Sequence, residues 1–471
     1  MRIRWRALSI LRFFRKQKSV TASAYTQELA WIAPFWAALS PYAYAREEDN
    51  VIIVPPNLVY KTNPTGIALI QHLEKGGRFE DIPGWNAEKA RQCIEFFLSI
   101  KAAYERKPFI PASVPYDFSF TSLPVLGEIA LTYRCNNACR FCYAGCNDVS
   151  ENKTPAPAGL STIELDTIGF KKVIDIFRDE AKIPFFSFTG GEPLLRPDLE
   201  ELAAYAVSRG LRVNLISNAT LASKERAASL FASGIHSAQV SLEAPESGMH
   251  DYLCGSPGSF AASVAGIHAL IGAGISVQTN STLTSRNRDA LLDMPEFVAT
   301  LGIRRMSMNL FIPSGSGLSD DSLYLPYTEA GAFVDAVRKR AKKAGVDFLW
   351  YSPTPLCIYN PLARGLGNKN CAACDGLLSV SPSGDVLPCS SYPKPVGNLI
   401  TDGFQSVWFS KDARYFKDKR YAPDSCRSCT AFTACQGACP LYWNYAGYAE
   451  LAGKAYSPSV SDTHRAQGVG S

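Results

Sequence analysis

The chain has 471 residues, of which 46% are hydrophobic and 19% are charged, as expected for a globular protein with a sizeable core. This length suggests two to three domains, and a net charge of +5 is too small to indicate nucleic-acid binding by itself. The 14 cysteines exclude a disulfide framework, which is typical of short secreted chains, and indicate metal or iron–sulfur ligands in a reducing, cytoplasmic compartment.

The first 18 residues contain seven arginines or lysines and no acidic residue. The apolar stretch from Leu29 to Ala45 follows too late for a signal peptide, is interrupted by Pro34 and Pro41, and is too short to cross a bilayer. We therefore expect residues 1–47 to be a basic extension. Its start is expected to be a solvated tail, with contact to anionic lipid or a partner as the less favoured alternative.

Residues 48–110 are expected to form a small module of strands and helices. Val51–Val54 and Leu58–Tyr60 flank a Pro-Pro-Asn turn, which favours a hairpin. A helix is expected from about Thr62 to His72, where two glycines soon follow, and Ala87–Arg106 has the apolar period of a second helix.

The stretch from Asn57 to Ile82 resembles the RiPP recognition element, a winged-helix module that captures the leader segment of ribosomally made precursor peptides. The resemblance implies that the leader adds as a strand to the edge of the sheet. A DNA-binding winged helix would need a basic recognition helix, whereas Ala87–Arg106 is of mixed charge, so no nucleic-acid partner is expected. A purely structural cap is the other alternative.

A proline-rich linker, Lys107–Pro124, precedes a central region at 125–325 in which strand-like and helix-like patterns alternate. Such alternation predicts parallel βα units. The expected strands are Ile129–Thr132, Phe185–Thr189, Val213–Ser217, Ala238–Leu242, Ser276–Ser281 and Arg305–Leu310. The expected helices include Leu165–Phe177, Asp198–Ser208, Lys224–Phe231, Phe260–Ile271 and Asp289–Thr300.

Cys135, Cys139 and Cys142 directly follow the first of these strands with the spacing C-x3-C-x2-C. Three thiolates so close together can hold a [4Fe–4S] cluster and leave one iron free for another ligand. Together with Cys146 the run has four thiols. The cysteine spacing by itself is therefore also compatible with a tetrahedral zinc site. Cys93 and Cys254 stand apart and are interpreted as packing residues.

A second motif, Gly190-Gly191-Glu192-Pro193, follows the second strand. The two motifs together resemble the signature of radical S-adenosylmethionine (SAM) enzymes. The resemblance implies an α/β fold with a partial (βα)6 barrel, a SAM molecule bound to the free iron, and an electron donor such as flavodoxin or ferredoxin. The electron would split SAM into methionine and a 5′-deoxyadenosyl radical. It further implies SAM contacts at Gly190, Gly191, Glu192, Ser217, Asn218 and Ser241.

The C-terminal region, 350–450, contains C-x9-G-x4-C from Cys374 to Cys389 and C-x2-C-x5-C-x3-C from Cys426 to Cys439. This pattern resembles the SPASM domain, which carries auxiliary [4Fe–4S] clusters. The resemblance implies one cluster on Cys374, Cys389 and Cys439, with Cys371 or Cys357 upstream, and another on Cys426, Cys429 and Cys435, whose usual last cysteine is missing. Ser390 stands where sulfatase-maturing relatives have aspartate, which argues against formylglycine formation.

These three resemblances lead us to expect a maturase that abstracts hydrogen from a ribosomally made precursor peptide and so cross-links, epimerises or cleaves it. No catalytic acid or base is assigned. A radical SAM enzyme that acts on a small molecule, such as one that trims a tetrapyrrole side chain, is the first alternative. A zinc-bound peptide-binding adaptor without enzymatic activity is the second.

Overall fold

The computed structural model describes residues 4–7, 25–54, 58–104, 112–115, 121–146, 160–161 and 163–454. They belong to two compact units, residues 1–125 and 126–471. Within the described residues, no helix has both the length and the apolar character needed to cross a bilayer. The predicted Pro-Pro-Asn turn at 55–57 and most of the expected linker lie outside the described residues.

The N-terminal unit is built on a five-stranded sheet with the order β2-β3-β4-β1-β5. The strands are β1 (Arg4–Ala7), β2 (Tyr44–Arg46), β3 (Val51–Val54), β4 (Leu58–Lys61) and β5 (Ala112–Pro115), the last within the expected linker. Strands β2, β3 and β4 form an antiparallel meander, which contains the predicted hairpin. Helices α3 (Pro64–Glu74) and α4 (Ala87–Tyr104) follow it, and the Asn63 side chain caps α3 through the Gly66 N–H at 2.8 Å.

Residues ahead of the predicted module also belong to its core. Helices α1 (Thr26–Leu29) and α2 (Ile32–Leu39) precede β2, and Trp36 of α2 is buried together with Ile52 and Phe97. Pro34 does not break this stretch, because it lies in the first turn of α2, where its missing N–H has no intrahelical partner to lose. The basic extension expected for 1–47 therefore contains part of the folded unit.

The second unit contains a ten-stranded sheet with the order β12-β11-β10-β9-β8-β7-β6-β13-β14-β15. Strands β6 to β12 are parallel neighbours. Their bounds are β6 (Leu126–Thr132), β7 (Phe185–Gly190), β8 (Arg212–Ser217), β9 (Ser237–Ser241), β10 (Ser276–Leu283), β11 (Arg305–Leu310) and β12 (Asp347–Trp350). The predicted α/β barrel with six βα units is confirmed, and β12 adds a seventh parallel strand that the sequence did not predict.

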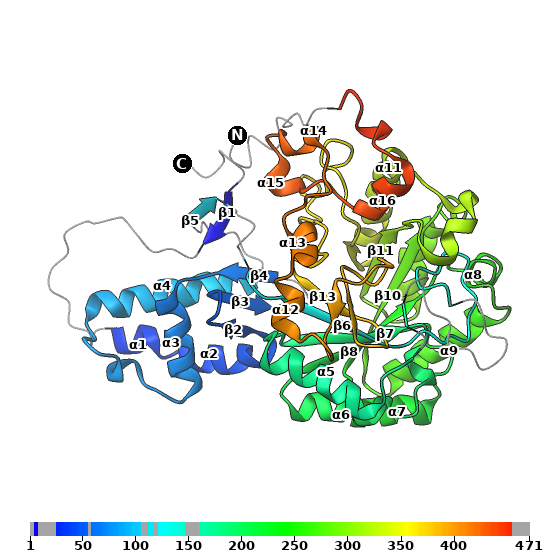
Figure 1. The fold of residues 1–471 in the computed structure, drawn as a ribbon. Coiled ribbons are helices and arrows are strands. Elements are labelled where there is room, and N and C mark those ends of the chain that lie inside the picture. The colour runs from blue at the N-terminus through cyan, green and yellow to red at the C-terminus, as the bar shows by residue number, and fades with distance from the viewer. Residues whose placement is uncertain are drawn as a thin grey trace. The chain divides into compact units, whose positions relative to one another are not determined.

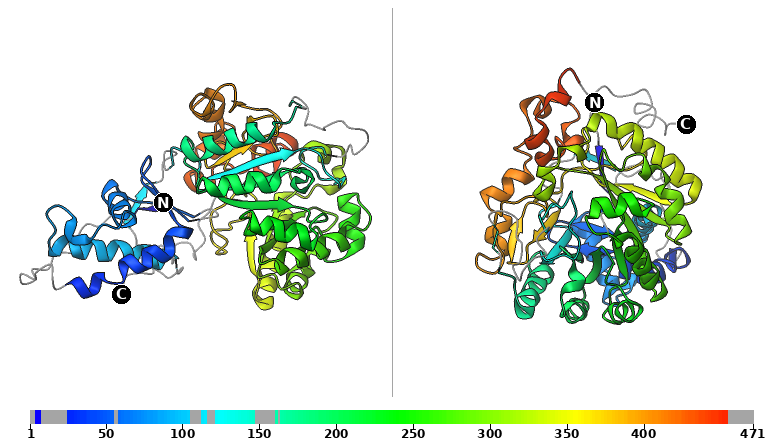
Figure 2. Two further views of the ribbon diagram at one scale, coloured as in Figure 1. Left: turned by 90° about the horizontal axis from the view of Figure 1, so that it is seen from below. Right: turned by 90° about the vertical axis from the view of Figure 1, so that its right-hand side faces the viewer.

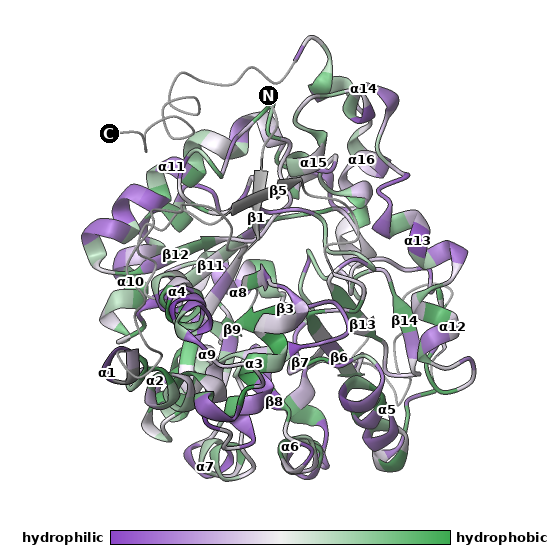
Figure 3. Ribbon diagram, turned by 90° about the vertical axis from the view of Figure 1, so that its left-hand side faces the viewer, coloured by the Kyte–Doolittle hydropathy of each residue, from purple (hydrophilic) through white to green (hydrophobic). Residues whose placement is uncertain are grey.

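Helices cover the outer side of these parallel strands. They are α5 (Thr167–Asp179), α6 (Leu199–Ser208), α7 (Lys224–Ala232), α9 (Ser259–Gly272), α10 (Met294–Thr300) and α11 (Tyr327–Ala344). Figure 1 shows α5, α6, α7 and α9 beside the strands, and Figure 3 shows α5, α6, α7, α10 and α11 as an arc outside them. The right-hand view of Figure 2 shows the same arc from the opposite side. The carboxyl ends of the strands consequently meet at one edge, where barrel enzymes place their chemistry.

The C-terminal region continues the barrel sheet. Strand β13 (Leu377–Val380) pairs in parallel with β6, and β14 (Asp385–Leu387) and β15 (Gly397–Asn398) follow antiparallel. A hairpin joins β13 to β14, and Gly384, whose φ is +86°, lies in its turn. Short helices follow: α12 (Phe404–Trp408), α13 (Lys411–Lys417), α14 (Asp424–Arg427), α15 (Phe432–Cys435) and α16 (Pro440–Ala446).

Candidate active site

The loop that carries Cys135, Cys139 and Cys142 begins directly after β6 and packs on the end of α8 (Ser247–Cys254). Two backbone hydrogen bonds flank Cys139: Ala138 N–H donates to the Cys254 carbonyl at 3.0 Å, and Arg140 N–H donates to the Leu253 carbonyl at 2.9 Å. The Arg140 guanidinium also lies 4.4 Å from the centre of the Tyr252 ring. The backbone around Cys139 is therefore fixed by contacts that do not involve its thiol.

The thiols of this loop lie close together. Burial raises the pKa of Cys135 to about 12, and the charges of Glu192 and Cys142 add to the effect. The charges of Cys142 and Cys135 likewise help to raise the pKa of Cys139. A hydrogen bond from the Cys146 thiol lowers the pKa of Cys142 to about 6. The structure thus brings the three predicted cysteines together and places Cys146 beside the last of them.

A further thiol reaches this loop from α8. The Glu243 N–H donates to His250 Nδ1 at 3.1 Å, so the ring proton is on Nε2, which lies 3.4 Å from Cys254 Sγ. A hydrogen bond with Cys139, together with one from His250, lowers the pKa of Cys254 to about 6. Cys93 packs in the core of the N-terminal unit, as interpreted from the sequence. Cys254 is buried too, but it contacts a cysteine of the loop, which its isolated position in the sequence did not indicate.

Gly190, the last residue of β7, and Gly191 bring the backbone of the second motif against the residues before Cys135. Gly191 N–H donates to the Thr132 carbonyl at 2.7 Å, and Glu192 N–H donates to the Arg134 carbonyl at 2.9 Å. A Cβ on Gly190, whose φ is +133°, would lie 2.2 Å from the Thr132 oxygen. A Cβ on Gly191 would lie 2.3 Å from the Arg134 oxygen. Only glycine allows this approach.

The buried Glu192 connects this motif to the end of β8. Its Oε1 accepts hydrogen bonds from Leu194 N–H at 3.0 Å and Ser217 Oγ at 2.7 Å, and its Oε2 accepts one from Asn218 N–H at 2.8 Å. Burial raises the pKa of the Glu192 carboxyl to about 7. The carboxylate has capacity for about four hydrogen bonds, so Oε2 keeps a free acceptor position.

Two more predicted contact residues lie at the same edge. The Asn218 side-chain amide donates to Asn136 Oδ1 at 2.9 Å, and its nitrogen lies 4.0 Å from Cys135 Sγ. Ser241 ends β9 and lies opposite Asn280 of β10. The predicted SAM-contact residues therefore share the edge of the sheet that carries the cysteine loop. Three thiols beside a glycine-lined backbone and buried polar groups fit an iron–sulfur cluster with a ligand that carries amino and carboxylate groups.

The raised pKa of Glu192 predicts a pH dependence of stability. A carboxyl whose pKa rises from about 4.5 to about 7 on folding contributes stability below pH 4.5 that is lost as the pH rises to 7. The total loss should be on the order of 3 kcal/mol. Denaturant unfolding of the metal-free protein between pH 5 and 8 should show this loss. Glu192→Gln should remove it, while Glu180→Gln, at an exposed glutamate, should keep it. Parallel pH profiles for wild type and Glu192→Gln would contradict the assignment.

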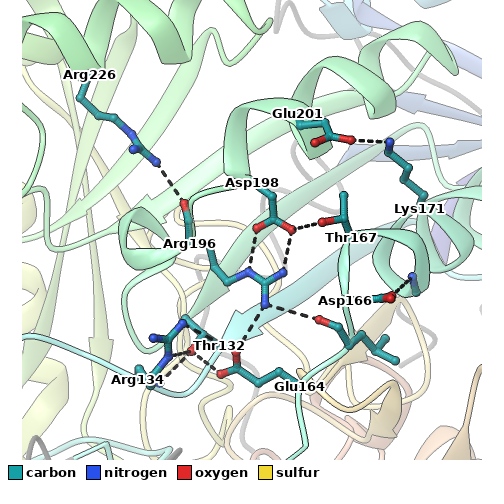
Figure 4. Close-up of polar contacts among 12 residues, drawn as sticks. Thr132, Arg134, Glu164, Asp166, Thr167, Lys171, Arg196, Asp198, Glu201 and Arg226 are labelled. Carbon is teal, nitrogen blue, oxygen red and sulfur yellow. Dashed lines mark hydrogen bonds and ion pairs between the residues drawn. The ribbon is translucent and has the colours of Figure 1, made fainter. Parts of the chain in front are cut away.

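An ion-pair network that the sequence did not predict surrounds the carboxyl end of β6 (Figure 4). The Arg196 guanidinium pairs with Asp198 at 2.7 Å and with Glu164 at 3.4 Å. The Thr132 hydroxyl donates to Glu164, and the Thr167 hydroxyl donates to Asp198 at 2.7 Å. Because Arg196 is only 8% exposed, the pairing is weakly screened by solvent. The last residue of β6 is thereby joined to the segments that open α5 and α6.

Four C-terminal cysteines form a second set of thiols, namely Cys371, Cys374, Cys389 and Cys439. Burial raises the pKa of Cys374 and Cys439 to about 12, and in both cases the charge of Cys371 contributes. The pKa of Cys389 is raised by burial and by the charges of Cys371 and Cys439. The sequence left Cys371 or Cys357 open as the upstream ligand, and the structure brings Cys371 to this set.

Glu128 links the barrel to this second set. It lies on β6, and its Oε1 accepts a hydrogen bond at 3.2 Å from the N–H of Ser390, the residue after Cys389. Burial raises the pKa of this carboxyl. A partly buried carboxyl with a raised pKa beside these thiols is a candidate for proton transfer. Sequence patterns missed Glu128 because it lies inside a strand.

The third set contains the predicted Cys426, Cys429 and Cys435, and Cys357 lies with them rather than with the second set. Among the described residues, no three Cys, His, Asp or Glu side chains converge on one point as the ligands of a single metal ion would. Apart from Cys93, the described thiols form three separate sets, one at the barrel edge and two in the C-terminal region.

Comparisons with known proteins identify both regions. Residues 129–298 match the radical SAM superfamily, and residues 371–430 match the iron–sulfur cluster-binding domain called SPASM. The AdoMet-dependent heme synthase of Nitratidesulfovibrio vulgaris is 30% identical over 67% of this chain and 88% of its own length. The mycofactocin maturase MftC of Mycobacterium ulcerans is 29% identical over 67% of this chain and 83% of its own.

Among solved structures, SuiB of Streptococcus suis bound to the precursor peptide SuiA has a similar fold. The TM-score is 0.61 at 14% identity, and the match covers 85% of this chain and 95% of SuiB. Taken with the sequence matches, the thiol sets and the glycine motif have a common explanation. The chain belongs to the radical SAM superfamily, and it is a radical SAM enzyme with a SPASM domain that uses [4Fe–4S] clusters and SAM.

Proposed function

We propose that this enzyme modifies a ribosomally made precursor peptide and binds the leader segment of that peptide through its N-terminal unit. The observation that carries the proposal is the order of elements in that unit, where the antiparallel meander β2-β3-β4 is followed by α3 and α4. This is the order expected for a leader-binding module at 48–110, which here also takes in α1 and α2. The same chain carries the radical SAM and SPASM regions.

An edge of this sheet is the proposed position for the leader. Among the described residues the strand order is β2-β3-β4-β1-β5, so β2 and β5 are the outer strands. An extended peptide that adds along an outer strand would gain main-chain hydrogen bonds, with specificity from the side chains next to it.

The charge of α4 supports a peptide rather than a nucleic acid as the partner. Arg91 of this helix is already paired, with Glu88 at 2.8 Å and with Glu95 at 2.9 Å. The helix has three cations (Lys89, Arg91 and Lys101) and two acids (Glu88 and Glu95), so it offers phosphates little net positive charge. We therefore propose that no nucleic acid binds here.

The structural comparison supports the same proposal. SuiB is bound to a precursor peptide, and its fold match covers 85% of this chain. Residues 126–471 make up less than three quarters of the chain, so the match includes part of the N-terminal unit. MftC, whose name states that it is a maturase, supports the same class of function.

The residues of the barrel edge can be given roles within this proposal. When bound, the cluster and SAM supply hydrogen-atom abstraction, which the protein directs. Cys135, Cys139 and Cys142 would hold the cluster, and the backbone at Gly190 and Gly191 would lie against SAM. Glu192 and Asn218 would orient its polar groups, because both are fixed by their hydrogen bonds to one another and to the cysteine loop. Holding the target carbon close in such a site makes the abstraction effectively unimolecular.

A small-molecule substrate is the second candidate, and one observation favours it. The heme synthase of N. vulgaris is 30% identical, and its name states a tetrapyrrole product. Its match covers 67% of this chain, whereas the fold match to SuiB covers 85%. The leader-binding unit is therefore the feature that separates the two candidates.

An anaerobic assay of reconstituted full-length protein with SAM and a reductant tests the proposal. We expect 5′-deoxyadenosine formation to rise several-fold when a precursor peptide encoded beside the gene is added, and the mass of the peptide to change. A matched control uses the same peptide without its leader, which should give little stimulation. If a porphyrin substrate stimulates 5′-deoxyadenosine formation and the peptide does not, the proposal is wrong and the hypothesis of a small-molecule substrate takes its place.

A further inference from the structure

Cys357 lies in a turn between the barrel and the SPASM region, ahead of the residues that match the SPASM family. The turn is closed by hydrogen bonds from the N–H groups of Ile358 and Tyr359 to the Pro355 carbonyl, at 2.9 and 3.0 Å. Upstream, the indole N–H of the buried Trp350 donates to the Thr354 hydroxyl at 2.9 Å. The position of Cys357 is therefore fixed by its own segment, without any contribution from its thiol.

This turn contacts the third set of thiols directly. The N–H of Leu356, the residue before Cys357, donates to Cys435 Sγ at 3.4 Å. In the same set, the Ala431 N–H donates to Cys429 Sγ at 3.4 Å. The cysteine loop of the barrel shows the same type of contact, in which the N–H two residues after a cysteine donates to its sulfur. Backbone N–H groups directed at sulfurs are a feature that tunes iron–sulfur clusters.

The four thiols of the third set lie within electrostatic range of one another. Cys357 is within range of Cys435 and Cys429, and Cys426 is within range of the other three. Cys426 and Cys429 are held by a turn in which Cys429 N–H donates to the Cys426 carbonyl at 3.0 Å. The turn with Cys357 and the turn with Cys426 thus bring the four thiols into one region.

The second set does not need Cys357, because it already contains four thiols. Its Cys371 and Cys374 are held by β13 and by the buried Lys419, whose ammonium donates to the Cys371 carbonyl at 2.7 Å and pairs with Asp375 at 2.9 Å. Cys374 N–H donates to the Pro388 carbonyl at 3.2 Å, next to Cys389. The eight cysteines of the C-terminal region therefore form two sets of four thiols each.

We propose that Cys357 is the fourth ligand of an auxiliary [4Fe–4S] cluster held by Cys426, Cys429 and Cys435. It takes the place of the cysteine that the SPASM pattern would supply after Cys439 and that this chain lacks. The cluster is then ligated by cysteine at all four irons and offers no open iron to a substrate. The proposal rests on the membership of the radical SAM superfamily and does not depend on which substrate the enzyme modifies.

Alkylation of the wild-type protein tests the proposal without any substitution. The full-length protein, reconstituted anaerobically, is treated with iodoacetamide before and after removal of iron by a chelator, and each cysteine is quantified by mass spectrometry. Cys357 should be protected in the reconstituted protein and should react at least tenfold faster after chelation, as should Cys426. Equal rates for Cys357 in the two states, with Cys426 protected only before chelation, would overturn the proposal.

Metal analysis of Cys357→Ala gives a second, independent measurement. Three loaded clusters give about 12 iron atoms per chain. The variant should lose between one and four of them, and should show the electron paramagnetic resonance signal of an oxidised three-iron cluster if it retains the other three. Cys93→Ala, at a cysteine buried in the N-terminal core, should keep the full content. Full iron content in Cys357→Ala without a three-iron signal would overturn the proposal, whatever the result of the peptide assay.

Discussion

Replacing Cys139 by alanine should reduce reductive cleavage of SAM by more than about a hundredfold, which places it below detection in an ordinary assay. Loss of an outer partner of a metal ligand already costs about ten- to a hundredfold, so loss of a ligand itself should cost more. The loop should keep its path, because the backbone bonds from Ala138 and Arg140 to α8 do not involve the Cys139 thiol. The variant should therefore be folded but inactive.

The measurement is 5′-deoxyadenosine formed by anaerobically reconstituted protein with SAM and reductant, normalised to folded protein. Cys93→Ala is the matched control, because it removes a buried thiol from the N-terminal core and should leave the rate unchanged. The iron content of Cys139→Ala should fall by about four atoms per chain, while both C-terminal clusters stay loaded. Robust 5′-deoxyadenosine formation by Cys139→Ala would contradict the assignment of Cys139 as a ligand of the SAM-binding cluster.

Gly190→Ala should lower the free energy of unfolding by about 4 kcal/mol and weaken SAM binding by more than about tenfold. Two effects combine at this position. The backbone has φ of +133°, which a side chain rarely adopts, and the new Cβ would lie 2.2 Å from the Thr132 carbonyl oxygen. Relief of this overlap requires the backbone of β7 to move away from the end of β6. That movement would displace Gly191 and Glu192 from their hydrogen bonds to the loop.

Denaturant unfolding of the metal-free protein and equilibrium dialysis of SAM with the reconstituted protein measure the two effects. Gly272→Ala is the control, because a Cβ there meets nothing within 4 Å in the last turn of α9. It should change stability by less than about 1 kcal/mol and leave SAM binding unchanged. A Gly190→Ala protein with wild-type stability and affinity would show that this edge does not need glycine.

The sequence predicted the central barrel well because short strand-like segments alternate regularly there with helical patterns. The first five of the expected strands begin or end within three residues of β6 to β10, and Arg305–Leu310 coincides with β11. Strand β12 was missed because it has four residues, lies at the edge of the sheet and starts with Asp347. Sequence pattern does not predict helix α2 because Pro34 interrupts the apolar stretch, although it lies in the first turn, where a helix tolerates proline.

The site was only partly predictable for a related reason. Spacing identified Cys135, Cys139 and Cys142 and the C-terminal cysteines because these ligands are close in sequence. Cys357 joins the third thiol set from far upstream, through a turn whose position depends on the fold. Glu128 and Arg196 likewise act through partners that only the folded chain brings near. Patterns that are local in sequence do not contain such information.

The pairing of β13 with β6 has a consequence for how the barrel is made. During synthesis, β6 to β12 emerge first, and the free side of β6 stays an open edge until Leu377–Val380 has been translated. An open edge strand presents unpaired N–H and carbonyl groups to other chains, which is a common route to aggregation. We therefore expect a chain that ends before Leu377 to expose the edge of β6, next to the cysteine loop, and to aggregate more readily than the whole chain.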